Sequence, residues 1–413
     1  MESLLSAFLE KPIMKEFTTI DLFAGAGGIT EGFRQEGFHC LFSNDFNPSA
    51  VETFRRNHPL TFSTCGPIEE QDPAEVRGLL GIKKGDLDCM LGGPPCQGFS
   101  IYAPDRIVDD PRNSMFRHYL RFVDEFAPKT LLIENVPGML SLARGLVVET
   151  ILSELANRGY HTTCRIMLAS QHGVPQNRFR LIFLASLKPG LIHPEPTHFA
   201  EARTNFTGGA TLTTRLQPLD ALVLKSAVTL RAAISDLPEI DAGGGSEEAS
   251  YGRKSRLSDY ASELRNGSSV LFNHTANRLS SINMERLSHI PPGGAWTDIP
   301  FDLLPAGMKK ARRSDHTKRY GRLEWDSLAC TMLTKCDPHW GAVFHPDQAR
   351  TFSVREAARI QSFPDSYRFL GTKGSQFEQV GNAVPVLLAK ALAGSMRAHL
   401  KSQLTKTCAV KRN

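Results

Sequence analysis

The sequence lacks the features that mark membrane proteins, disulfide scaffolds and zinc modules. No run approaches the roughly 18 uninterrupted apolar residues of a membrane-spanning helix. The start, MESLLSAFLEKPIMKEF, has three glutamates and no secretory-signal pattern, and it favours a short amphipathic helix. The eight cysteines are scattered without a C-x-x-C pair. We therefore expect a cytoplasmic protein without membrane anchor or metal, in which any functional cysteine acts as a thiol.

Neither sign of charge dominates the 413 residues. Lys and Arg number 48 and Asp and Glu 43, so the formal net charge is +5, which permits a polyanionic partner without demanding one. Neither the phosphate-binding pattern G-x-x-x-x-G-K-[ST] nor the dinucleotide pattern G-x-G-x-x-G occurs. The hydrophobic fraction of 41% is typical of globular proteins, and the length favours two or three structural units.

Short apolar runs alternate with helical patterns in the N-terminal half, which predicts an α/β fold with a parallel sheet covered by helices. From about residue 188 to 320 the periodicity is poor and Gly and Pro recur, which indicates an irregular second domain. Residues 380–400 are expected to form a glycine-asparagine turn followed by a helix. The expected strands are 17–23, 38–43, 87–91, 130–134, 160–169 and 178–186, and the expected helices are 29–35 and 146–158.

A glycine cluster, Phe23-Ala24-Gly25-Ala26-Gly27-Gly28, follows the first predicted strand. Glycine has no Cβ, so the backbone can approach a ligand closely there. Asp45 follows Gly25 by twenty residues, at the end of the second strand, where a carboxylate can accept hydrogen bonds from ribose hydroxyls. Phe46 beside it can stack on an adenine. The pattern predicts an adenosyl cofactor, and the alternative is a structural turn with a solvent-facing aspartate.

Two further strand ends carry reactive side chains. Cys96 lies in GGPPCQGFS, where two prolines fix the backbone in front of the thiol. A cysteine is often only a small apolar residue, but the carboxyl end of a strand is where open sheets bind ligands, which favours a nucleophile. Glu134 ends another apolar strand, where a carboxylate can share a proton with a substrate ring nitrogen.

Two clusters of basic residues leave alternatives open. In QNRFR, alternation points Gln176, Arg178 and Arg180 to one side, either as a functional face or as a salt-bridge cluster. Residues 308–322 hold seven Lys or Arg against the single acid Asp315. Taken alone, such a run is usually a solvated face.

Taken in order, these residues resemble the cytosine-C5 DNA methyltransferase family, of the bacterial modification-enzyme type. The matching segments are DLFAGAGG, SNDF, GGPPCQGFS, ENV, QNRFR, REAARIQSFPD and QVGNAVP. The resemblance covers nearly the whole chain, although residues 180–355 match only partly. It implies a Rossmann-like class I methyltransferase sheet in a catalytic domain (1–187 and 370–413) that binds S-adenosylmethionine. It also implies a smaller, irregular target-recognition domain (188–369) that binds double-stranded DNA.

The resemblance also implies a role for each matching residue. The Cys96 thiolate would add to C6 of a cytosine flipped out of the duplex, and Glu134 would hold N3 and the exocyclic amine. Arg180 would hold O2 and Arg178 would order the pocket around the cysteine. The base would also meet Pro94, through its carbonyl, and Gln97. The implied cofactor contacts are Phe23, Gly25, Gly27, Gly28, Asp45, Phe46, Ile68 and Asn382, and the implied DNA contacts are Lys309, Lys310, Arg312 and Arg313.

One departure and two rival functions accompany the resemblance. Where the family often has an acid contacting the adenine amine, this chain has Pro67 after Gly66, which leaves Ile68 as the possible contact. A tRNA cytosine methyltransferase is one rival, although its Cys-Phe-Thr stretch is replaced here by Cys330-Thr331-Met332. A catalytically silent DNA-binding homologue is the other. The bacterial type also suggests association with the nucleoid and a cognate restriction endonuclease that shares the target sequence.

Overall fold

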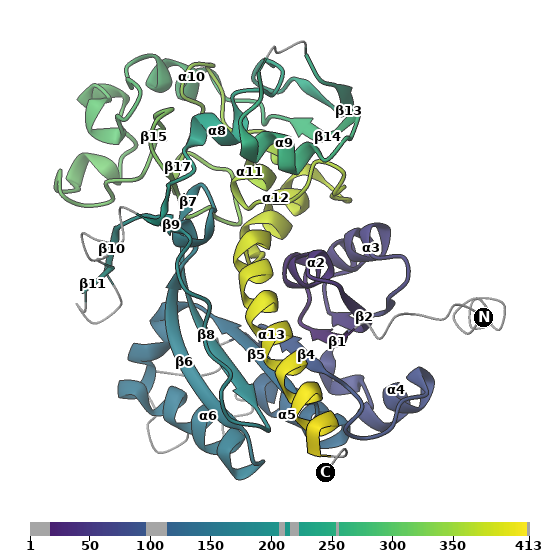
Figure 1. Ribbon diagram of the computed structural model, residues 1–413. Helices are drawn as coiled ribbons and strands as arrows, with labels where there is room; N and C mark the ends of the chain where they lie inside the picture. The colour runs from purple at the N-terminus through teal and green to yellow at the C-terminus, as the bar shows by residue number, and fades with distance from the viewer. Residues whose placement is uncertain (1–16, 96–113, 206–210, 215–222, 253–255, 411–413) are drawn as a thin grey trace.

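A seven-stranded mixed sheet forms the lower half of the molecule in the computed structural model, which describes residues 17–95, 114–205, 211–214, 223–252 and 256–410 (Figure 1). The strand order is β3-β2-β1-β4-β5-β8-β6, and β8 runs antiparallel to both of its neighbours. The other pairs from β3 to β5 are parallel. The strands are β1 (Phe17–Leu22), β2 (Phe38–Asp45), β3 (Phe62–Cys65), β4 (Cys89–Gly92), β5 (Thr130–Asn135), β6 (His161–Leu168) and β8 (Phe179–Ser186).

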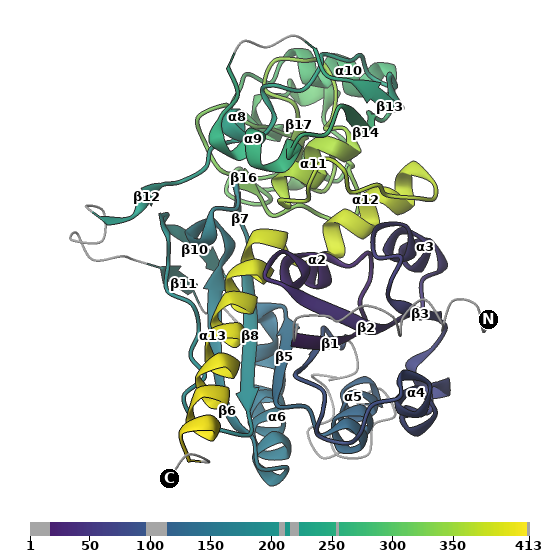
Figure 2. The same cartoon turned by 45° about the vertical axis from the view of Figure 1, so that its right-hand side comes forward.

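Helices cover both faces of this sheet because its strands are apolar on both sides (Figures 1 and 2). In β8, Leu181 and Phe183 pack in the cluster on one face, whereas Ile182 and Leu184 pack in the cluster on the other. The first face is covered by α4 (Pro73–Leu80), α5 (Ser114–Phe126) and α6 (Leu146–Asn157). The second is covered by α2 (Gly28–Gln35) and α13 (Val386–Val410), so the last helix returns to the sheet.

Most of the second region, residues 188–385, lies above the carboxyl ends of the parallel strands and consists of short elements (Figure 1). Its main core includes Leu230, Leu271, Phe352 and Phe369, and a smaller cluster surrounds Trp296. Its longer elements are β10 (Ala202–Asn205), β11 (Thr211–Thr214), α8 (Leu230–Ile234), β13 (Gly245–Ser250), α9 (Asp259–Arg265), β14 (Val270–Thr275), α10 (Ser281–Ser288), α11 (Val354–Ile360) and α12 (Lys373–Asn382).

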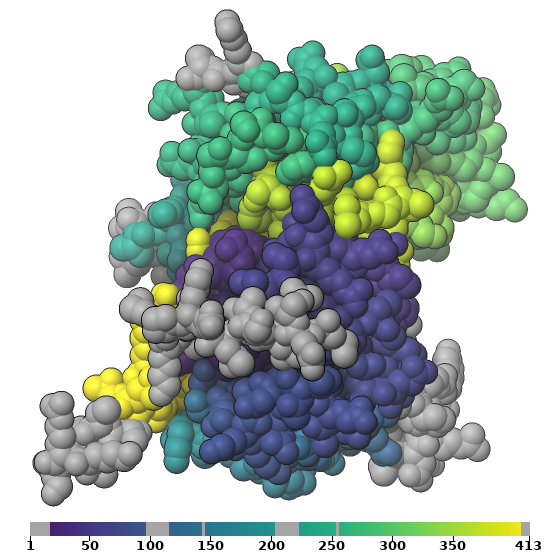
Figure 3. All heavy atoms as spheres, turned by 90° about the vertical axis from the view of Figure 1, so that its right-hand side faces the viewer, coloured from purple at the N-terminus to yellow at the C-terminus, as the bar shows by residue number. Residues whose placement is uncertain are grey.

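Several short strands and one more helix complete the fold. Helix α3 (Pro48–Asn57) lies next to α12, at the border between the sheet and the second region. In Figure 3, residues 350–385 lie between the sheet and the rest of the second region. The short strands are β7 (Gln176–Asn177), β9 (His198–Phe199), β12 (Lys225–Ser226), β15 (Gly321–Arg322), β16 (Ala329–Cys330) and β17 (Ala342–Phe344).

The expected α/β fold is confirmed, and all six expected strands and both expected helices are present within about two residues. The expected turn at 380–382 is wrong, because these residues end α12. Thr372 caps that helix by accepting a hydrogen bond from the Ser375 amide, and Phe377 and Val380 are buried in the core of the second region. The expected N-terminal helix lies outside the described residues.

The chain returns from the second region to the sheet near Pro385. Phe377 and Val380 of α12 pack in the core of the second region, whereas Leu388 and Leu392 of α13 pack on the sheet. We therefore propose that the catalytic domain resumes at about residue 385 rather than at 370. Within the described residues, no helix is both long enough and apolar enough to span a membrane.

Candidate active site

The carboxyl ends of β4 and β5 bring together a loop and a carboxylate. Glu134 is the fifth residue of β5, and the loop Gly93-Pro94-Pro95 continues from β4. A Cβ on Gly93 would lie only 3.2 Å from Glu134 Oε2, so the absent side chain lets the carboxylate lie against the loop. Cys96 and Gln97, which follow this loop, lie outside the described residues.

Glu134 and Arg180 form an ion pair between neighbouring strands. Glu134 Oε1 lies 2.5 Å from Arg180 Nε, and the two side chains are only 14% and 10% exposed. Burial lowers the pKa of the Arg180 guanidinium, and the Glu134 charge opposes that shift. Because both residues lie at the edge of the sheet that carries the loop toward Cys96, a small planar base there can meet a carboxylate and a guanidinium together.

Arg178 points toward the second region instead of toward Glu134. Its guanidinium donates hydrogen bonds to the carbonyl oxygens of Met332 (3.0 Å), Gly381 (2.7 Å) and Ala383 (3.2 Å). The side chain is fully buried, and this burial lowers its pKa. Arg178 therefore fastens the end of α12 and residue 332 to the strand that continues to Arg180.

The single polar face expected for Gln176, Arg178 and Arg180 is wrong. Gln176 donates to Gln361 Oε1 (2.9 Å) and accepts from the Met332 amide (2.7 Å), so it joins Arg178 in contacting the second region. Arg180 alone turns to Glu134. The strand is interrupted at Arg178, between β7 and β8, so simple alternation does not extend through this segment.

Asn135 was not singled out by the sequence, although it stands beside Glu134. Its Nδ2 donates a hydrogen bond to the Pro94 carbonyl at 2.8 Å, and its Oδ1 accepts from the Val136 amide at 2.9 Å. Pro94 O is the atom that the resemblance directs to a substrate amine. A carbonyl oxygen has two lone pairs, so this contact fixes the loop and still leaves one acceptor position.

In the glycine turn after β1, one glycine faces open space and two are packed against other segments. Gly25 has φ +54° and nothing lies within 4 Å of a Cβ placed there. A Cβ on Gly27 would lie 2.7 Å from Tyr367 Oη, and one on Gly28 would lie 2.6 Å from Val384 O. Close ligand approach is therefore available at Gly25, whereas Gly27 and Gly28 let the second region and its return segment pack against α2.

Asp45 is held at the end of β2 by the glycine turn. Its Oδ2 accepts a hydrogen bond from the Gly25 amide at 2.8 Å, and its Oδ1 accepts from the Asn47 amide at 2.9 Å. Burial raises the pKa of this carboxyl, and these amide donors act in the opposite direction. Phe46 is 70% exposed beside it, so an aromatic face is open to a ligand.

The other expected cofactor residues occupy different settings. Phe23 takes the uncommon φ of +57° at the start of the glycine turn. Ile68 is only 3% exposed in the core below the sheet, so its side chain offers little surface to an adenine. Asn382 is exposed at the end of α12, next to Gly381, whose carbonyl binds Arg178.

Asp21 is a buried acid that the sequence interpretation passed over. It lies in β1 just before the glycine turn, and its Oδ2 accepts a hydrogen bond from Thr30 Oγ1 at 2.6 Å. Its Oδ1 has no partner among the described residues, and burial raises the pKa of this carboxyl to about 7. The sequence signal that could have identified Asp21 is its position as an acid inside the apolar run FTTIDLF.

The basic run lies on the surface of the second region, except for Arg319 and Arg322, which are half-buried. Lys309, Lys310, Arg312 and Arg313 are all exposed. Arg322, in contrast, turns inward and donates to the carbonyls of Ile290, His345 and Pro346. The four residues expected to contact DNA are therefore accessible, whereas Arg322 holds the fold of the region.

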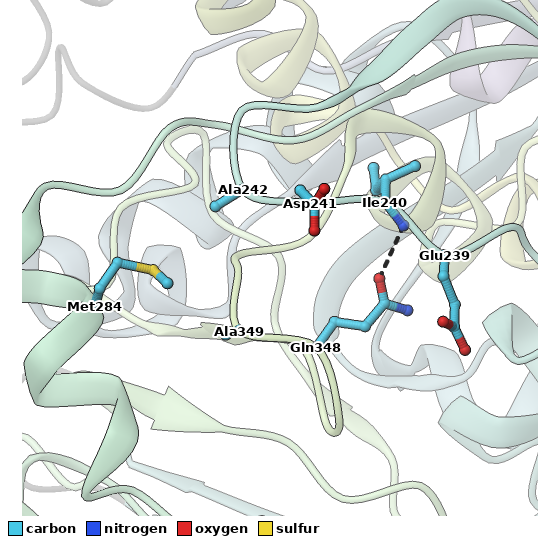
Figure 4. Close-up of a pocket in the computed structure, with 7 residues that line it drawn as sticks. All are labelled: Glu239, Ile240, Asp241, Ala242, Met284, Gln348 and Ala349. Carbon is cyan, nitrogen blue, oxygen red and sulfur yellow. Dashed lines mark hydrogen bonds between the residues drawn. The ribbon is translucent and has the colours of Figure 1, made fainter.

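A cavity of about 490 Å³ is built only from loops and one helix of the second region (Figure 4). Gln348 Oε1 accepts from the Ile240 amide at 3.1 Å across it. The cavity carries the acidic side chains Glu239 and Asp241, which repel DNA phosphates, and neither Glu134 nor Arg180 lines it. Within the described residues no group of three or more His, Cys, Asp or Glu side chains could hold a metal ion. The lining residues are Glu239, Ile240, Asp241, Ala242, Met284, Gln348 and Ala349.

Solved structures share this architecture. A DNA modification methyltransferase encoded within an E. coli prophage superposes with a TM-score of 0.69 at 24% identity, covering 93% of this chain and 99% of the other. The Dnmt2 methyltransferase of S. pombe gives a TM-score of 0.53 at 18% identity, with coverages of 93% and 99%. These likenesses confirm the Rossmann-like methyltransferase fold.

Relatives that are similar in sequence show the family as well as the fold. The Type II methyltransferase M.AgeI of Thalassovita gelatinovora is 36% identical, over 92% of this chain and 99% of the relative. M.DdeI of Desulfomicrobium norvegicum is 34% identical, over 91% and 87%. The mouse DNA (cytosine-5)-methyltransferase 1 is 32% identical over 92% of this chain but only 28% of its own length. The family profile described as C-5 cytosine-specific DNA methylase matches residues 17–398, and the chain therefore belongs to this family of DNA (cytosine-5)-methyltransferases.

Proposed function

We propose that this protein methylates C5 of a cytosine flipped out of a specific duplex DNA sequence, with S-adenosylmethionine as the methyl donor. The observation that carries the proposal is the Glu134–Arg180 ion pair, which lies against the loop leading from β4 to Cys96. The open glycine position and Asp45 stand at the same edge of the sheet. A base and a cofactor can therefore meet above the strand ends, where open α/β sheets bind ligands.

The residues after β1 and β2 fit an adenosyl cofactor. Gly25 leaves open space, and each Asp45 oxygen accepts one amide hydrogen bond, which leaves lone pairs for ribose hydroxyls. Phe46 offers an exposed ring for the adenine, and Asn382 lies exposed at the end of α12. We propose that Phe23, Gly25, Asp45, Phe46 and Asn382 hold the cofactor. In this scheme Ile68, Gly27 and Gly28 support the site by packing.

The chemistry begins with a nucleophile that activates the base. Cytosine C5 is a poor nucleophile, so the Cys96 thiolate adds to C6 and the displaced π electrons make C5 an enamine carbon. When bound, S-adenosylmethionine supplies an electrophilic methyl group. After methylation a base, which we propose to be water, removes the C5 proton, and the electrons of that C–H bond expel Cys96. A stacked base cannot undergo these steps, so the cytosine must leave the helix.

Two charged side chains hold the ring during addition. Glu134 holds N3 and the exocyclic amine, and a proton on its carboxyl can be shared with N3 as charge develops there. Arg180, whose Nε lies 2.5 Å from Glu134 Oε1, holds O2. Arg178 acts indirectly, because its hydrogen bonds to residues 332, 381 and 383 fix the pocket wall.

Bisulfite sequencing of DNA from cells that express the protein tests the function and returns the target sequence. We expect protected cytosines at one short sequence, and none in cells with the empty vector. A duplex carrying 5-fluorocytosine at that position should then form a covalent adduct that maps to Cys96, because fluorine at C5 cannot leave as a proton does. An adduct on another cysteine would overturn the mechanism. Methylation of tRNA in place of duplex DNA would support the RNA rival.

The exposed basic run is proposed to bind the DNA backbone. Replacing Lys309, Lys310, Arg312 and Arg313 together by glutamine should weaken duplex binding and reduce the slope of log K against log salt by up to about 4, because roughly one counterion is released per phosphate contact. Titration of a duplex at several salt concentrations measures this slope. An unchanged slope would mean that the basic run is only a solvated face.

The bacterial Type II relatives support a wider proposal. We infer that a restriction endonuclease with the same target accompanies this enzyme in a cytoplasmic restriction-modification system, with the enzyme on the nucleoid when bound to DNA. Cells that express the protein should yield DNA that resists one endonuclease, which cuts the same target sequence when it is unmethylated.

A further inference from the structure

Trp340 differs from the other two tryptophans of the chain in its exposure and its hydrogen bonding. The indole N–H of Trp296 donates to Asp315 O at 3.1 Å, and that of Trp325 donates to Asp347 Oδ2 at 2.6 Å. Trp340 is 55% exposed, and its indole N–H has no acceptor among the described residues. The fold therefore leaves both apolar and polar parts of this side chain available to a ligand.

The exposed indole is nevertheless held in place. Asp337 begins a tight turn in which its carbonyl accepts from the Trp340 amide at 3.0 Å and its Oδ1 accepts from the His339 amide at 2.9 Å. The Arg319 guanidinium lies 4.8 Å from the centre of the indole ring. The His339 ring meets the indole edge-on at 5.0 Å. Such a preorganised aromatic side chain loses little conformational entropy on binding.

The sequence segment that ends at Trp340 is basic. Residues 308–340 contain eight Lys or Arg and four Asp or Glu. Lys318 and Lys335 are exposed, and Arg319 stacks on the indole. The nearest acid in sequence, Asp337, already uses one oxygen within its own turn. An exposed aromatic ring among cations is the combination that binds nucleic acid through base stacking and phosphate contacts together.

The Trp340 turn is connected to the active site through Leu333. A Cβ on Gly341 would lie 3.1 Å from Leu333 Cδ1, and a Cβ on Gly381 would lie 2.3 Å from Leu333 O. Arg178 donates to the carbonyl of the preceding residue, Met332. The turn therefore packs against Leu333, next to the Met332 carbonyl that Arg178 binds from the strand leading to Arg180.

We propose that Trp340, supported by Arg319 and His339, stacks on a nucleobase of the target duplex next to the extruded cytosine. This inference rests on the function proposed above. Extrusion of one base exposes the faces of its neighbours, and an aromatic ring that covers such a face recovers lost stacking. Trp340 therefore contributes to recognition of the target sequence, whereas the basic run supplies the general attraction for DNA.

Titrations of Trp340→Ala and Trp340→Phe with two duplexes test the proposal. One duplex carries the sequence returned by bisulfite sequencing and the other, of equal length, lacks it. We expect Trp340→Ala to weaken binding of the target duplex about tenfold and to leave its salt slope unchanged, because no charge is removed. Trp340→Phe should retain most of the affinity. Binding to the duplex without the target should change little in both variants.

Leu79→Ala is the matched control, because Leu79 is an exposed apolar side chain on α4, at the far end of the sheet domain. It should bind both duplexes as the wild type does. If Trp340→Ala binds the target as tightly as wild type, or if Trp340→Phe is as weak as Trp340→Ala, stacking by Trp340 is refuted while methylation by the wild type stands. If the wild-type protein methylates no DNA, the proposed function fails, and this inference fails with it.

Discussion

Replacing Glu134 with glutamine is expected to lower kcat for DNA methylation by roughly 10²–10⁴-fold. Glutamine keeps the size of the side chain but can neither share a proton with cytosine N3 nor balance the charge of Arg180, which lies 2.5 Å away. Transfer of labelled methyl groups to the target duplex measures the effect under saturating substrate. Adduct formation with 5-fluorocytosine should slow in parallel, because Glu134 acts on the addition step.

Glu125→Gln is the control for this substitution. Glu125 Oε1 lies 2.6 Å from Arg77 Nε in a more exposed ion pair between α5 and α4. Its replacement should leave kcat unchanged. If Glu134→Gln retains wild-type turnover, or if both variants lose turnover equally, the assignment of Glu134 to the base is wrong. Thermal melting of both variants separates a loss of catalysis from a loss of folding.

Replacing Arg359 with leucine is expected to lower the free energy of unfolding by about 3–5 kcal/mol. Arg359 is completely buried and pairs with two carboxylates, Asp236 at 2.5 Å and Asp365 at 2.6 Å. These partners raise the pKa of the guanidinium, while Arg359 holds the pKa of Asp365 below its usual range. Leucine would remove the cation that lies between the two buried carboxylates. Asp236 would keep Arg265 at 2.6 Å, whereas the remaining cation of Asp365, Arg355, lies 3.9 Å away. Urea unfolding followed by tryptophan fluorescence measures the loss.

Arg231→Leu is the matched comparison for burial. Arg231 binds Asp326 through two hydrogen bonds of 2.8 and 2.9 Å, but both side chains are largely exposed. Solvent screens such a pair, so its removal should not shift the urea midpoint measurably. Equal losses in the two variants would show that the buried network around Arg359 contributes no more than a surface pair.

This network lies inside the second region and holds together parts of it that are far apart in the sequence. Asp236 follows α8, whereas Arg359 lies near the end of α11 and Asp365 just after it, so two segments far apart in the sequence meet. Tyr251 adds a hydrogen bond to Asp365 Oδ2 at 2.6 Å. The sequence REAARIQSFPD resembles a family segment, but nothing in it indicates which acids its arginines bind.

The local pattern of the sequence determined the α/β sheet, the strand ends that carry Glu134 and Asp45, and the family, because apolar periodicity and short motifs are properties of neighbouring residues. Only the tertiary structure decided that Arg178 turns away from Arg180, that Gly27 and Gly28 serve packing, and that Trp340 stays exposed while Trp296 is buried. Each of these depends on which distant backbone or side chain fills the adjacent space, and spacing along the chain carries no information about that.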